Sequence, residues 1–388
     1  MRVFISTGEV SGDLQGALLI EALRRQADRQ GIDLEIVALG GDRMAKAGAK
    51  VLTDTTQIGS IGLLESIPYV LTTIQLQRRV KRYLRANPPD VVVMIDYFGP
   101  NLGIGWFVRK RFPQVPTVYY IAPQEWIWSM GDRNTDRILQ ISDRLLAIFQ
   151  GEADYYQKRG GNVAWVGHPL LDLMQQAPTR AAARQTLGIA ADQLVVALIP
   201  ASRQQELRYL LPNLFAAAQQ VQTQVPQVQF WIPLSLASYR TVVEEAVQQY
   251  RLNAQVVMQQ SQTVIAAADL AIAKSGTVNL ETALLNVPQV VVYRLSPLTA
   301  WIAYNVLKFK IQFASPPNLV LMKEIVPELL QENAMPEQIA RTAIRLLLEP
   351  EARSQMQQDY QQMRQALGEV GVCDRAAAEI LAMQRRSV

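Results

Sequence analysis

Short apolar runs alternate along the first half of the chain with segments in which apolar residues recur every three or four positions. The pattern predicts strands followed by helices, beginning with a strand over 2–7 and a helix that presents Leu14, Leu18 and Leu23 on one face. Uniformly apolar strands that alternate with helices are typical of a parallel sheet covered on both faces. The further strands of this set are predicted at 34–40, 91–96, 117–123, 144–149 and 163–167.

A second series of strands and helices follows a polar connector near residues 175–184. Its strands are predicted at 194–200, 228–234, 254–258, 269–273 and 289–293. We therefore expect two open α/β domains, residues 1–175 and 176–350, that face each other across a cleft. A helical tail, residues 351–388, is expected to pack back toward the first domain. Sites in such sheets lie at the carboxyl ends of strands, so residues at those ends are the first candidates for chemistry.

Two segments depart from this pattern. Residues 61–76 are strongly apolar, and residues 297–311 have a similar character. The first of them leads into a basic cluster formed by Arg78, Arg79, Lys81, Arg82 and Arg85. An apolar segment beside a cluster of cations suits an anionic membrane surface. The alternative is a core helix with a solvated basic end, and the pattern alone does not separate the two.

Composition narrows the class of protein. The 388 residues are 49% hydrophobic and 19% charged, which is apolar for a globular protein. The sequence contains no run of about 18 uncharged apolar residues, so it does not predict a membrane span. The apolar excess suggests a homodimer or a membrane contact instead. A net charge of +4 is compatible with anionic substrates or lipid headgroups and does not require nucleic acid. The single cysteine, Cys373, excludes a disulfide framework and fits a reducing compartment.

Histidine occurs once, at His168. This argues against histidine-based metal sites and against a serine–histidine triad, unless His168 is its base. A carboxylate is therefore the better candidate for a general base. Asp96 is the first choice because it ends a fully apolar predicted strand, although an aspartate there could simply cap the next helix. Glu9 and Asp13, in the turn after the first strand, carry the same ambiguity, and Ser11 suits a helix cap.

In the second half, residues 271–294 have the pattern strand, turn, helix, turn and strand. Gly276 lets backbone approach a bound group, and Ser275 and Thr277 could cap the helix or donate to phosphate oxygens. Backbone N–H groups and the positive end of a helix dipole suit a diphosphate. Glu281, one turn later on the same side, could accept hydrogen bonds from ribose hydroxyls. An ordinary helix cap is the alternative.

A second anion-binding candidate follows the strand at 194–200. Arg203 could pair with a diphosphate through two parallel hydrogen bonds, with Glu206 orienting it. The alternative is a surface arginine at the start of a helix. Two converging anion-binding features favour a nucleotide sugar over a dinucleotide, and the turn at Gly8 lacks the G-x-G-x-x-G spacing.

Aromatic residues and the lone histidine are the remaining candidates in the first half. The rings of Trp126 and Trp128 could line a sugar or acyl pocket, although buried aromatics more often belong to a core. His168 follows a strand and precedes Pro169. It either holds the domain junction or contacts a ligand.

Eight motifs in one order resemble a single family, the lipid-A-disaccharide synthases, which are glycosyltransferases of the GT-B type. The motifs are GEVSGD at Gly8, SIGLLE at Ser60, VVVMID ending at Asp96, PQEWIW at Pro123, VGHPLLD at Val166, PASRQQE at Pro200, AKSGTVNLE at Ala273 and ASPPNL at Ala314. The resemblance runs from Met1 to about Ala382 and implies two Rossmann-like domains. It implies transfer of 2,3-diacylglucosamine from UDP to 2,3-diacylglucosamine 1-phosphate, which forms a β-1,6-linked disaccharide and releases UDP. It also implies no metal or other cofactor, and a peripheral location at the cytoplasmic face of the inner membrane.

The resemblance further implies roles for residues. Asp96 would be an essential carboxylate, which we interpret as the base that takes the proton from the acceptor 6-hydroxyl in an inverting displacement. Arg203 and Asn318 would be important polar residues, and the turn from Ser275 to Glu281 would bind UDP. From the residues and the resemblance together we predict that UDP is bound by Ser202, Arg203, Glu206, Ser275, Gly276, Thr277 and Glu281. We predict that the acceptor and its acyl chains contact Glu9, Ser11, Asp13, Glu65, Trp126, His168 and Asn318.

The chain departs from the family pattern at three positions. Gly99 replaces a second carboxylate three residues after Asp96, Ala201 replaces the glycine usual before Ser202, and Glu125 stands where a small apolar residue is common. Three alternatives therefore stay open: another GT-B transferase, a UDP-N-acetylglucosamine 2-epimerase or a non-catalytic paralogue. The first would be expected to open with a glycine-rich turn, and the second to carry several histidines. Gly99 is the only hint of the third.

Overall fold

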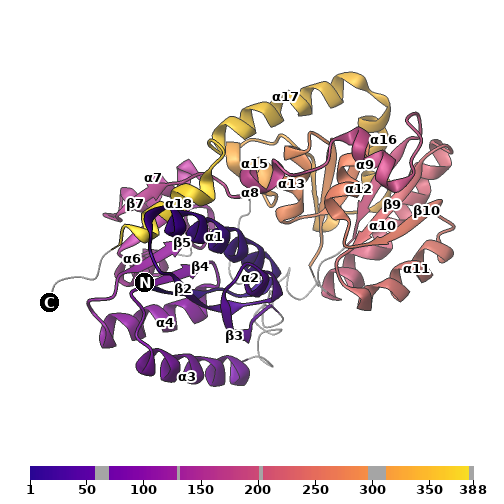
Figure 1. Ribbon diagram of the computed structural model, residues 1–388. Coiled ribbons are helices and arrows are strands. Elements are labelled where there is room, and N and C mark those ends of the chain that lie inside the picture. The colour runs from indigo at the N-terminus through magenta and orange to yellow at the C-terminus, as the bar shows by residue number, and fades with distance from the viewer. Residues whose placement is uncertain (57–69, 129–131, 201–203, 296–311, 384–388) are drawn as a thin grey trace. The chain divides into compact units, whose positions relative to one another are not determined.

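The computed structural model describes residues 1–56, 70–128, 132–200, 204–295 and 312–383. The chain divides into two compact units (Figure 1). The N-terminal unit comprises Met1–Leu173 and Leu367–Val388, and the C-terminal unit comprises Met174–Ala366. Each unit is built on its own parallel sheet.

The N-terminal unit contains a seven-stranded sheet in the order β3-β2-β1-β4-β5-β6-β7, and every pairing within it is parallel. The middle strand, β4, is buried along its whole length because helices cover both faces of the sheet. The strands are β1 (Arg2–Ser6), β2 (Glu35–Gly40), β3 (Lys50–Asp54), β4 (Val91–Ile95), β5 (Thr117–Tyr120), β6 (Arg144–Ala147) and β7 (Val163–Trp165).

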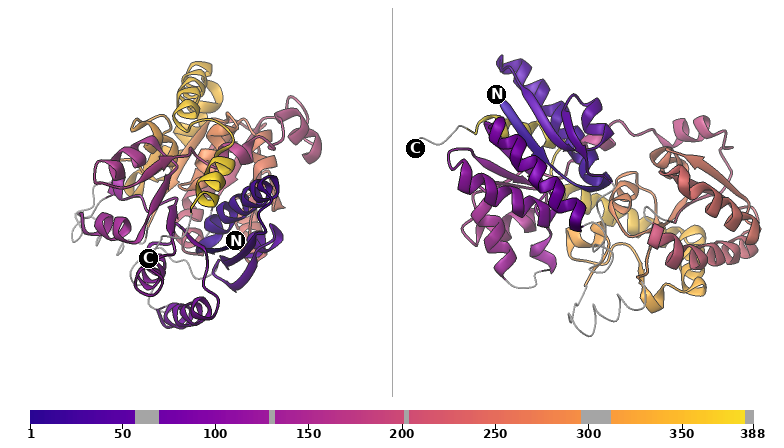
Figure 2. Two further views of the ribbon diagram at one scale, coloured as in Figure 1. Left: turned by 60° about the vertical axis from the view of Figure 1, so that its left-hand side comes forward. Right: turned by 90° about the horizontal axis from the view of Figure 1, so that it is seen from below.

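Helices from distant parts of the chain cover the two faces of this sheet (Figures 1 and 2). One face packs against α3, α4 and α6, and its core includes Val92 and Met94 from β4. The other face lies under α1, which packs against α2 and α18. The helices of this unit are α1 (Glu9–Gln30), α2 (Asp42–Lys46), α3 (Val70–Ala86), α4 (Phe98–Arg111), α5 (Glu125–Trp128), α6 (Asp132–Ile141), α7 (Gln150–Gln157), α8 (Leu170–Met174) and α18 (Val372–Leu381).

The carboxylate of Asp172 attaches α18 to the N-terminal unit. It accepts hydrogen bonds from the backbone N–H groups of Gly371 (2.6 Å), Val372 (3.2 Å) and Cys373 (2.8 Å), which begin the helix. A carboxylate at a helix N-terminus satisfies backbone donors that have no partner within the helix. The sequence predicted that the whole tail 351–388 packs toward the first domain. In the structure α17 (Pro350–Ala366) belongs to the C-terminal unit, and only the segment from Leu367 onward returns.

The C-terminal unit contains a six-stranded parallel sheet in the order β10-β9-β8-β11-β12-β13. Its strands are β8 (Val195–Ile199), β9 (Gln229–Leu234), β10 (Ala254–Met258), β11 (Leu270–Lys274), β12 (Gln289–Tyr293) and β13 (Glu328–Leu330). Its helices, besides α17, are α9 (Arg180–Leu187), α10 (Gln204–Gln224), η2 (Ala237–Tyr239), α11 (Arg240–Gln249), α12 (Ser261–Ala267), α13 (Thr277–Leu284), α15 (Pro316–Leu321), η4 (Gln331–Asn333) and α16 (Pro336–Leu348).

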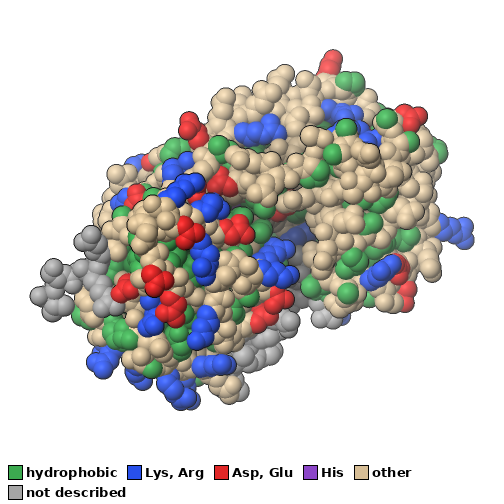
Figure 3. All heavy atoms as spheres, viewed as in Figure 1, with side chains coloured by type: hydrophobic (Ala, Val, Ile, Leu, Met, Phe, Trp, Pro, Cys, Tyr) green, Lys and Arg blue, Asp and Glu red, His purple; other side chains and the backbone are tan. Residues whose placement is uncertain are grey.

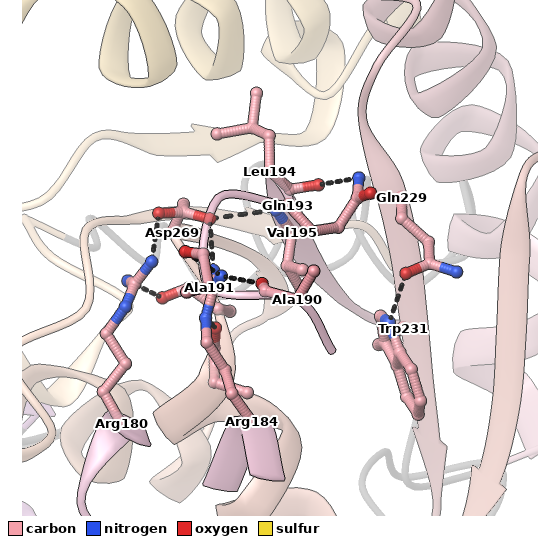
Figure 4. Close-up of polar contacts among 12 residues, drawn as sticks. Arg180, Arg184, Ala190, Ala191, Gln193, Leu194, Val195, Gln229, Trp231 and Asp269 are labelled. Atoms are coloured by element: carbon pink, nitrogen blue, oxygen red, sulfur yellow. Dashed lines mark hydrogen bonds and ion pairs between the residues drawn. The ribbon is translucent and has the colours of Figure 1, made fainter. Parts of the chain in front are cut away.

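An ion cluster centred on the buried Asp269 joins α9 to the amino ends of β8 and β11 (Figure 4). Asp269 accepts hydrogen bonds from Arg180 (2.6 Å), Arg184 (2.9 Å) and the backbone N–H of Val195 (2.9 Å). Arg184 also donates to the carbonyl oxygens of Ala190 and Ala191, in the loop before β8, and of Ala267 at the end of α12. The cluster lies at the ends of the strands opposite to those where ligands bind in such sheets, so its role is structural.

Two strands were not anticipated from the sequence, β3 and β13. Both lie at an edge of their sheet and are only half-buried, and they lack the continuous apolar run that marked the central strands. The prediction of two α/β domains with parallel sheets is confirmed.

Candidate functional site

The carboxyl end of β4 carries the first candidate, Asp96. The residue is exposed, and it adopts a left-handed backbone conformation with φ of 45°; the next residue, Tyr97, has φ of 52°. Such conformations are uncommon in residues other than glycine and cost of order 1–3 kcal/mol each. The surrounding structure therefore has to hold them, and residues held in this way cluster at functional sites.

Three hydrogen bonds hold the main chain of Asp96. Its N–H donates to the carbonyl oxygen of Ile121 (3.0 Å). Its own carbonyl oxygen accepts from the Tyr119 hydroxyl (2.8 Å) and from the Asn101 side-chain amide (2.6 Å). Burial, and then the charge of Asp96, raise the pKa of Tyr119 well above its usual value, so this hydroxyl stays protonated and donates.

The turn after β1 lies against the turn after β4. A Cβ atom on Gly8 would stand 2.4 Å from the ring of Tyr97, so only glycine fits at this point of the GEVSGD motif. Ser11 is exposed in the first turn of α1. The side chain of Glu9, and the whole of Glu65, lie outside the described residues.

Asp13, a predicted acceptor-side residue, is buried and its carboxylate is already engaged. It accepts hydrogen bonds from the backbone N–H groups of Gly41 (2.7 Å), Arg43 (3.2 Å) and Met44 (3.1 Å), at the start of α2. These bonds cap α2, whose N-cap residue, Gly41, has no side chain that could do so. Asp13 therefore fixes the loop after β2, and a contact with the substrate stays a prediction.

Trp126, Phe149 and His168 form a stack of rings within the N-terminal unit. The centroid of Phe149 lies 5.9 Å from that of Trp126 and 5.3 Å from that of His168. The Trp126 indole N–H donates to the Gln124 side chain at 2.7 Å. This arrangement is an apolar packing contact with its polar group satisfied, and a role in holding substrate stays a prediction.

His168 is buried and neutral. Burial lowers the pKa of its imidazole to about 3. Its Nδ1 accepts the backbone N–H of Leu170 at 3.2 Å, which places the ring proton on Nε2. A neutral ring fixed in this way orders the turn into α8, and it is not poised to act as a base at neutral pH. Holding the domain junction and contacting a ligand both stay predictions.

Two glutamates near these rings were not selected from the sequence as site residues. Burial raises the pKa of Glu152 to about 8, and its carboxyl group accepts from the backbone N–H of Ile148 at 2.9 Å. Glu125 accepts from Asn134 through Oε1 (3.1 Å), while Oε2 is buried and has no hydrogen-bond partner within the described ranges, and burial raises the pKa of this carboxyl group. In the sequence both glutamates stand near apolar and aromatic residues at the start of a helix. An acid in that position is also typical of a helix cap, so the sequence alone does not mark either one as a site residue.

The turn after β11 carries the candidates of the C-terminal unit. The Ser275 hydroxyl donates to the carbonyl oxygen of Ala314 (2.7 Å), and the N–H of Gly276 donates to Asn279 Oδ1 (2.7 Å). Thr277 begins α13, and Glu281 lies one turn further along it. The ammonium of Lys274 lies only 2.9 Å from the place of a Gly276 Cβ. Lys274 thus adds a cation to this turn that the sequence reasoning did not single out.

Asn318 and Glu328 secure the neighbouring loop. Asn318 is fully buried; its Oδ1 accepts the N–H groups of Ile325 (2.7 Å) and Val326 (2.9 Å), and its Nδ2 donates to Glu328 (2.7 Å). Glu328 also accepts from the N–H of Ala314 (2.6 Å), the residue that receives the Ser275 hydroxyl. Asn318 is therefore a scaffold for the Ser275 turn, and a direct substrate contact stays a prediction.

The predicted site residues that follow β8 lie largely outside the residues that the structure describes. Ser202 and Arg203 lie outside the described residues, as does the side chain of Glu206. The first residue of α10 is Gln204, so this helix begins five residues after β8 ends.

Among the residues described, no group of three His, Cys, Asp or Glu side chains could hold a metal ion. No helix in the described ranges is long and apolar enough to span a membrane.

Comparisons with known proteins agree with this geometry. A family model described as lipid-A-disaccharide synthetase matches residues 3–383. The lipid-A-disaccharide synthase of Gloeothece citriformis is 59% identical over 381 residues, which cover 98% of this chain and 99% of that protein. The solved structure of S. aureus MnaA with UDP has a TM-score of 0.70 at 13% identity and covers 100% of this chain and 99% of its own.

The UDP-GlcNAc 2-epimerase of Neisseria meningitidis, solved with UDP-GlcNAc, has a TM-score of 0.61 at 13% identity, covering 98% of this chain and 99% of its own. At such low identity the two structural matches show the fold alone. They confirm the predicted fold class, two parallel-sheet α/β domains of the GT-B type.

Proposed function

The chain belongs to the lipid-A-disaccharide synthase family, and from this premise we propose how its residues carry out the reaction. The protein is a UDP-sugar-dependent glycosyltransferase that moves 2,3-diacylglucosamine onto 2,3-diacylglucosamine 1-phosphate and releases UDP. In our proposal the N-terminal unit supplies the base, and the C-terminal unit binds the nucleotide.

Asp96 is the proposed base. It takes the proton from the acceptor 6-hydroxyl while that oxygen attacks the anomeric carbon, so the C–O bond to UDP breaks and the configuration inverts. The observation that carries the assignment is the exposed carboxylate on a left-handed residue at the end of β4, with its main chain bound on both sides. A positioned base of this kind typically contributes about 100- to 10,000-fold in rate.

The leaving diphosphate is proposed to bind at the turn after β11. The Lys274 ammonium and the start of α13 place positive charge there. Arg203, which follows β8 in sequence, is proposed to pair with the same diphosphate, and Glu281 to accept from the ribose hydroxyls. One such contact is typically worth about 2.7–4 kcal/mol of barrier. Two hydrogen bonds support this turn: Glu328 accepts from the N–H of Ala314, and the carbonyl oxygen of Ala314 accepts from the Ser275 hydroxyl, which fixes the serine side chain.

We also propose that α3 and α4 contact an anionic membrane surface. Leu76, Val80 and Leu84 are buried in the core, while four arginines of the 78–85 cluster are exposed. Figure 3 shows Lys and Arg side chains along the edge of the N-terminal unit that carries α3. Ile74 on α3 and Trp106 on α4 are also exposed, 43% and 45%, and cations with exposed apolar side chains suit a headgroup layer.

Two apolar segments, 61–76 and 297–311, prompted the membrane hypothesis. Residues 61–69 of the first and the whole of the second lie outside the described residues. A peripheral location at the inner membrane rests on the α3 and α4 surface alone, and a homodimer stays a prediction. Among the described residues, the apolar side of α3 packs in the core while its basic side is solvated. This is what the alternative, a core helix with a solvated basic end, expects of this part of the segment, and the membrane contact stays a proposal.

A product assay tests the proposed function. The purified protein is incubated with UDP-2,3-diacylglucosamine and 2,3-diacylglucosamine 1-phosphate, and the products are identified by mass spectrometry. We expect UDP and a tetraacylated disaccharide 1-phosphate. A 2-epimerase would release no disaccharide, a transferase with another acceptor would leave the 1-phosphate unused, and a non-catalytic paralogue would leave both substrates unchanged.

A further inference from the structure

Asn101 is fully buried in the first turn of α4 and uses both ends of its amide. Its Oδ1 accepts the Ser6 hydroxyl at 2.6 Å, which fixes the orientation of the amide. Its Nδ2 then faces the carbonyl oxygens of Asp96 (2.6 Å), Ile95 (3.2 Å) and Ser6 (3.4 Å). The shortest of these bonds goes to Asp96, so the amide of Asn101 acts chiefly on that residue.

A second buried donor reaches the same atom. The Tyr119 hydroxyl donates to the Asp96 carbonyl oxygen at 2.8 Å, and the tyrosine is itself fully buried on β5. With the Asp96 N–H bound to Ile121, both main-chain polar groups of this residue are fixed. An unpaired carbonyl at this depth would itself be costly, but one donor would satisfy it. Two donors converging on the carbonyl of a left-handed residue exceed that need.

The backbone conformation of Asp96 sets the direction of its Cα–Cβ bond and therefore of its carboxylate. Left-handed φ at a strand end turns that bond away from the direction that a further strand residue would give it. Returning to an extended conformation would relieve an aspartate and a tyrosine of left-handed strain. The carbonyl bonds from Asn101 and Tyr119 oppose that relaxation, because they form only when the peptide after Asp96 points its oxygen inward.

We infer that Asn101 and Tyr119 are positioning residues for glycosyl transfer, acting through the main chain of Asp96 to hold its carboxylate in the direction needed for proton removal. The inference rests on the proposed role of Asp96 as base. Neither residue needs to touch the substrate. Their loss should therefore lower kcat while leaving KM and UDP affinity as they are.

The test uses two adjacent tyrosines. Tyr119 and Tyr120 are both fully buried on β5, but successive side chains of a strand point to opposite faces, and the Tyr120 hydroxyl faces the Cys373 thiol. Tyr119→Phe removes one donor to Asp96 and keeps the ring, whereas Tyr120→Phe is the matched control. We expect kcat to fall about 2- to 10-fold in Tyr119→Phe, equivalent to one neutral hydrogen bond, and to stay unchanged in the control.

Asn101→Asp is the stronger variant. It keeps the acceptor for Ser6 but replaces the donor with an oxygen that faces three carbonyl oxygens. We expect roughly a 100-fold loss in kcat, the scale of a misplaced catalytic group. Because this variant could also fold poorly, Tyr119→Phe decides the matter, with Tm measured for every variant.

Asp96→Asn separates the two claims. If Asp96→Asn is inactive while Tyr119→Phe matches Tyr120→Phe in kcat, the positioning role is wrong and the base assignment stands. A Tyr119→Phe defect that appears equally in KM, or only together with a lower Tm, also overturns positioning. Near-normal turnover in Asp96→Asn would overturn the proposed base and, with it, this inference. A selective fall in kcat in Tyr119→Phe, with an inactive Asp96→Asn, supports both.

Discussion

The main-chain N–H of Asp96 donates a 3.0 Å hydrogen bond to the carbonyl oxygen of Ile121. Both residues have positive φ angles, 45° and 58°, and for a β-branched isoleucine this conformation is a marked departure. The strands that end at these residues pair in register, with Ile95 opposite Tyr120. The bond therefore extends the ladder by one step beyond the sheet, where both chains turn. Asp96 leaves the sheet from a rigid edge, so changes to its side chain should affect chemistry more than folding.

Asp96→Asn should abolish turnover and spare UDP binding. The amide has nearly the same shape but cannot accept the hydroxyl proton, so kcat should fall by at least about 100-fold. The affinity for UDP, measured by calorimetry, should match that of the unchanged protein, since the nucleotide is proposed to bind in the C-terminal unit. Asp132→Asn is the control because that carboxylate is 75% exposed and, among the described residues, forms a surface ion pair with Arg159. Turnover near the normal rate in Asp96→Asn would rule out its role as base.

His168 should not titrate between pH 5 and pH 8. Its pKa in the folded protein is lowered to about 3 by burial, against 6.5 in an unfolded chain. Since the chain contains a single histidine, the imidazole Cε1–H resonance is unambiguous, and its chemical shift should stay constant over this range. The unfolded chain binds the proton more tightly, so the stability contributed by the neutral ring is complete above pH 6.5 and is lost as the pH falls toward 3.

The control for this titration is His168→Asn, whose Oδ1 can replace Nδ1 as acceptor for the Leu170 N–H. The variant should lose that part of the acid sensitivity which His168 contributes, as measured by urea denaturation at pH 7 and pH 5. A resonance that shifts with a midpoint near 6.5 would show that the ring is solvated and would contradict its structural role.

Charge reversal on α3 should weaken binding to anionic vesicles. Arg78, Arg79 and Arg82 are exposed, and each cation near an anionic surface is worth about 1 kcal/mol. Changing all three to glutamate should lower the partition coefficient at least about 100-fold in sedimentation with phosphatidylglycerol vesicles. The control changes three exposed cations elsewhere in the N-terminal unit, Arg29, Lys46 and Lys158, to glutamate.

The two triple variants have the same net charge, so their comparison separates a local surface from bulk electrostatics. Equal loss in both would mean that net charge alone attracts the protein to the vesicles. No loss in the α3 variant would contradict the membrane surface proposed for α3 and α4.

The central strands and Asp96 could be predicted because their signals are local. An apolar run specifies a buried strand, and a carboxylate directly after it lies at the edge of the sheet where sites occur. The left-handed conformation of Asp96 could not be predicted in the same way. It depends on Asn101, on Tyr119 and on Ser6, which lies 95 positions from Asn101 in the chain.

Long-range hydrogen bonds also explain why predicted site residues were found in supporting positions. Asp13 was chosen for its place in a turn, but its carboxylate binds N–H groups some 28 to 31 residues away. Asn318 was chosen through the family resemblance, yet its amide is occupied by β13 and the loop before it. Nothing in the local sequence separates an exposed polar side chain from one whose partners lie on another element.

Arg184 and Arg180 should differ sharply in their effects on stability although both bind Asp269. The Arg184 side chain is 6% exposed and that of Arg180 is 48% exposed. Arg184→Met would remove the buried one of the two cations that bind the 10% exposed carboxylate of Asp269, and it would take the same donor from several carbonyl oxygens. Breaking a buried pair costs about 3–5 kcal/mol. Arg180→Met removes a solvent-screened partner, and an exposed pair is worth only about 0–1 kcal/mol.

Urea denaturation of the two methionine variants measures this difference, and Asp269 is the common partner that makes them comparable. Both changes remove one positive charge and keep a long apolar side chain, so neither net charge nor volume explains an unequal result. Equal losses of unfolding free energy would mean that water reaches Arg184 and that the Asp269 ion cluster does not join α9 to the sheet. The Asp269 ion cluster lies at the amino ends of β8 and β11, which indicates a structural role. The UDP affinity of folded Arg184→Met should therefore stay normal.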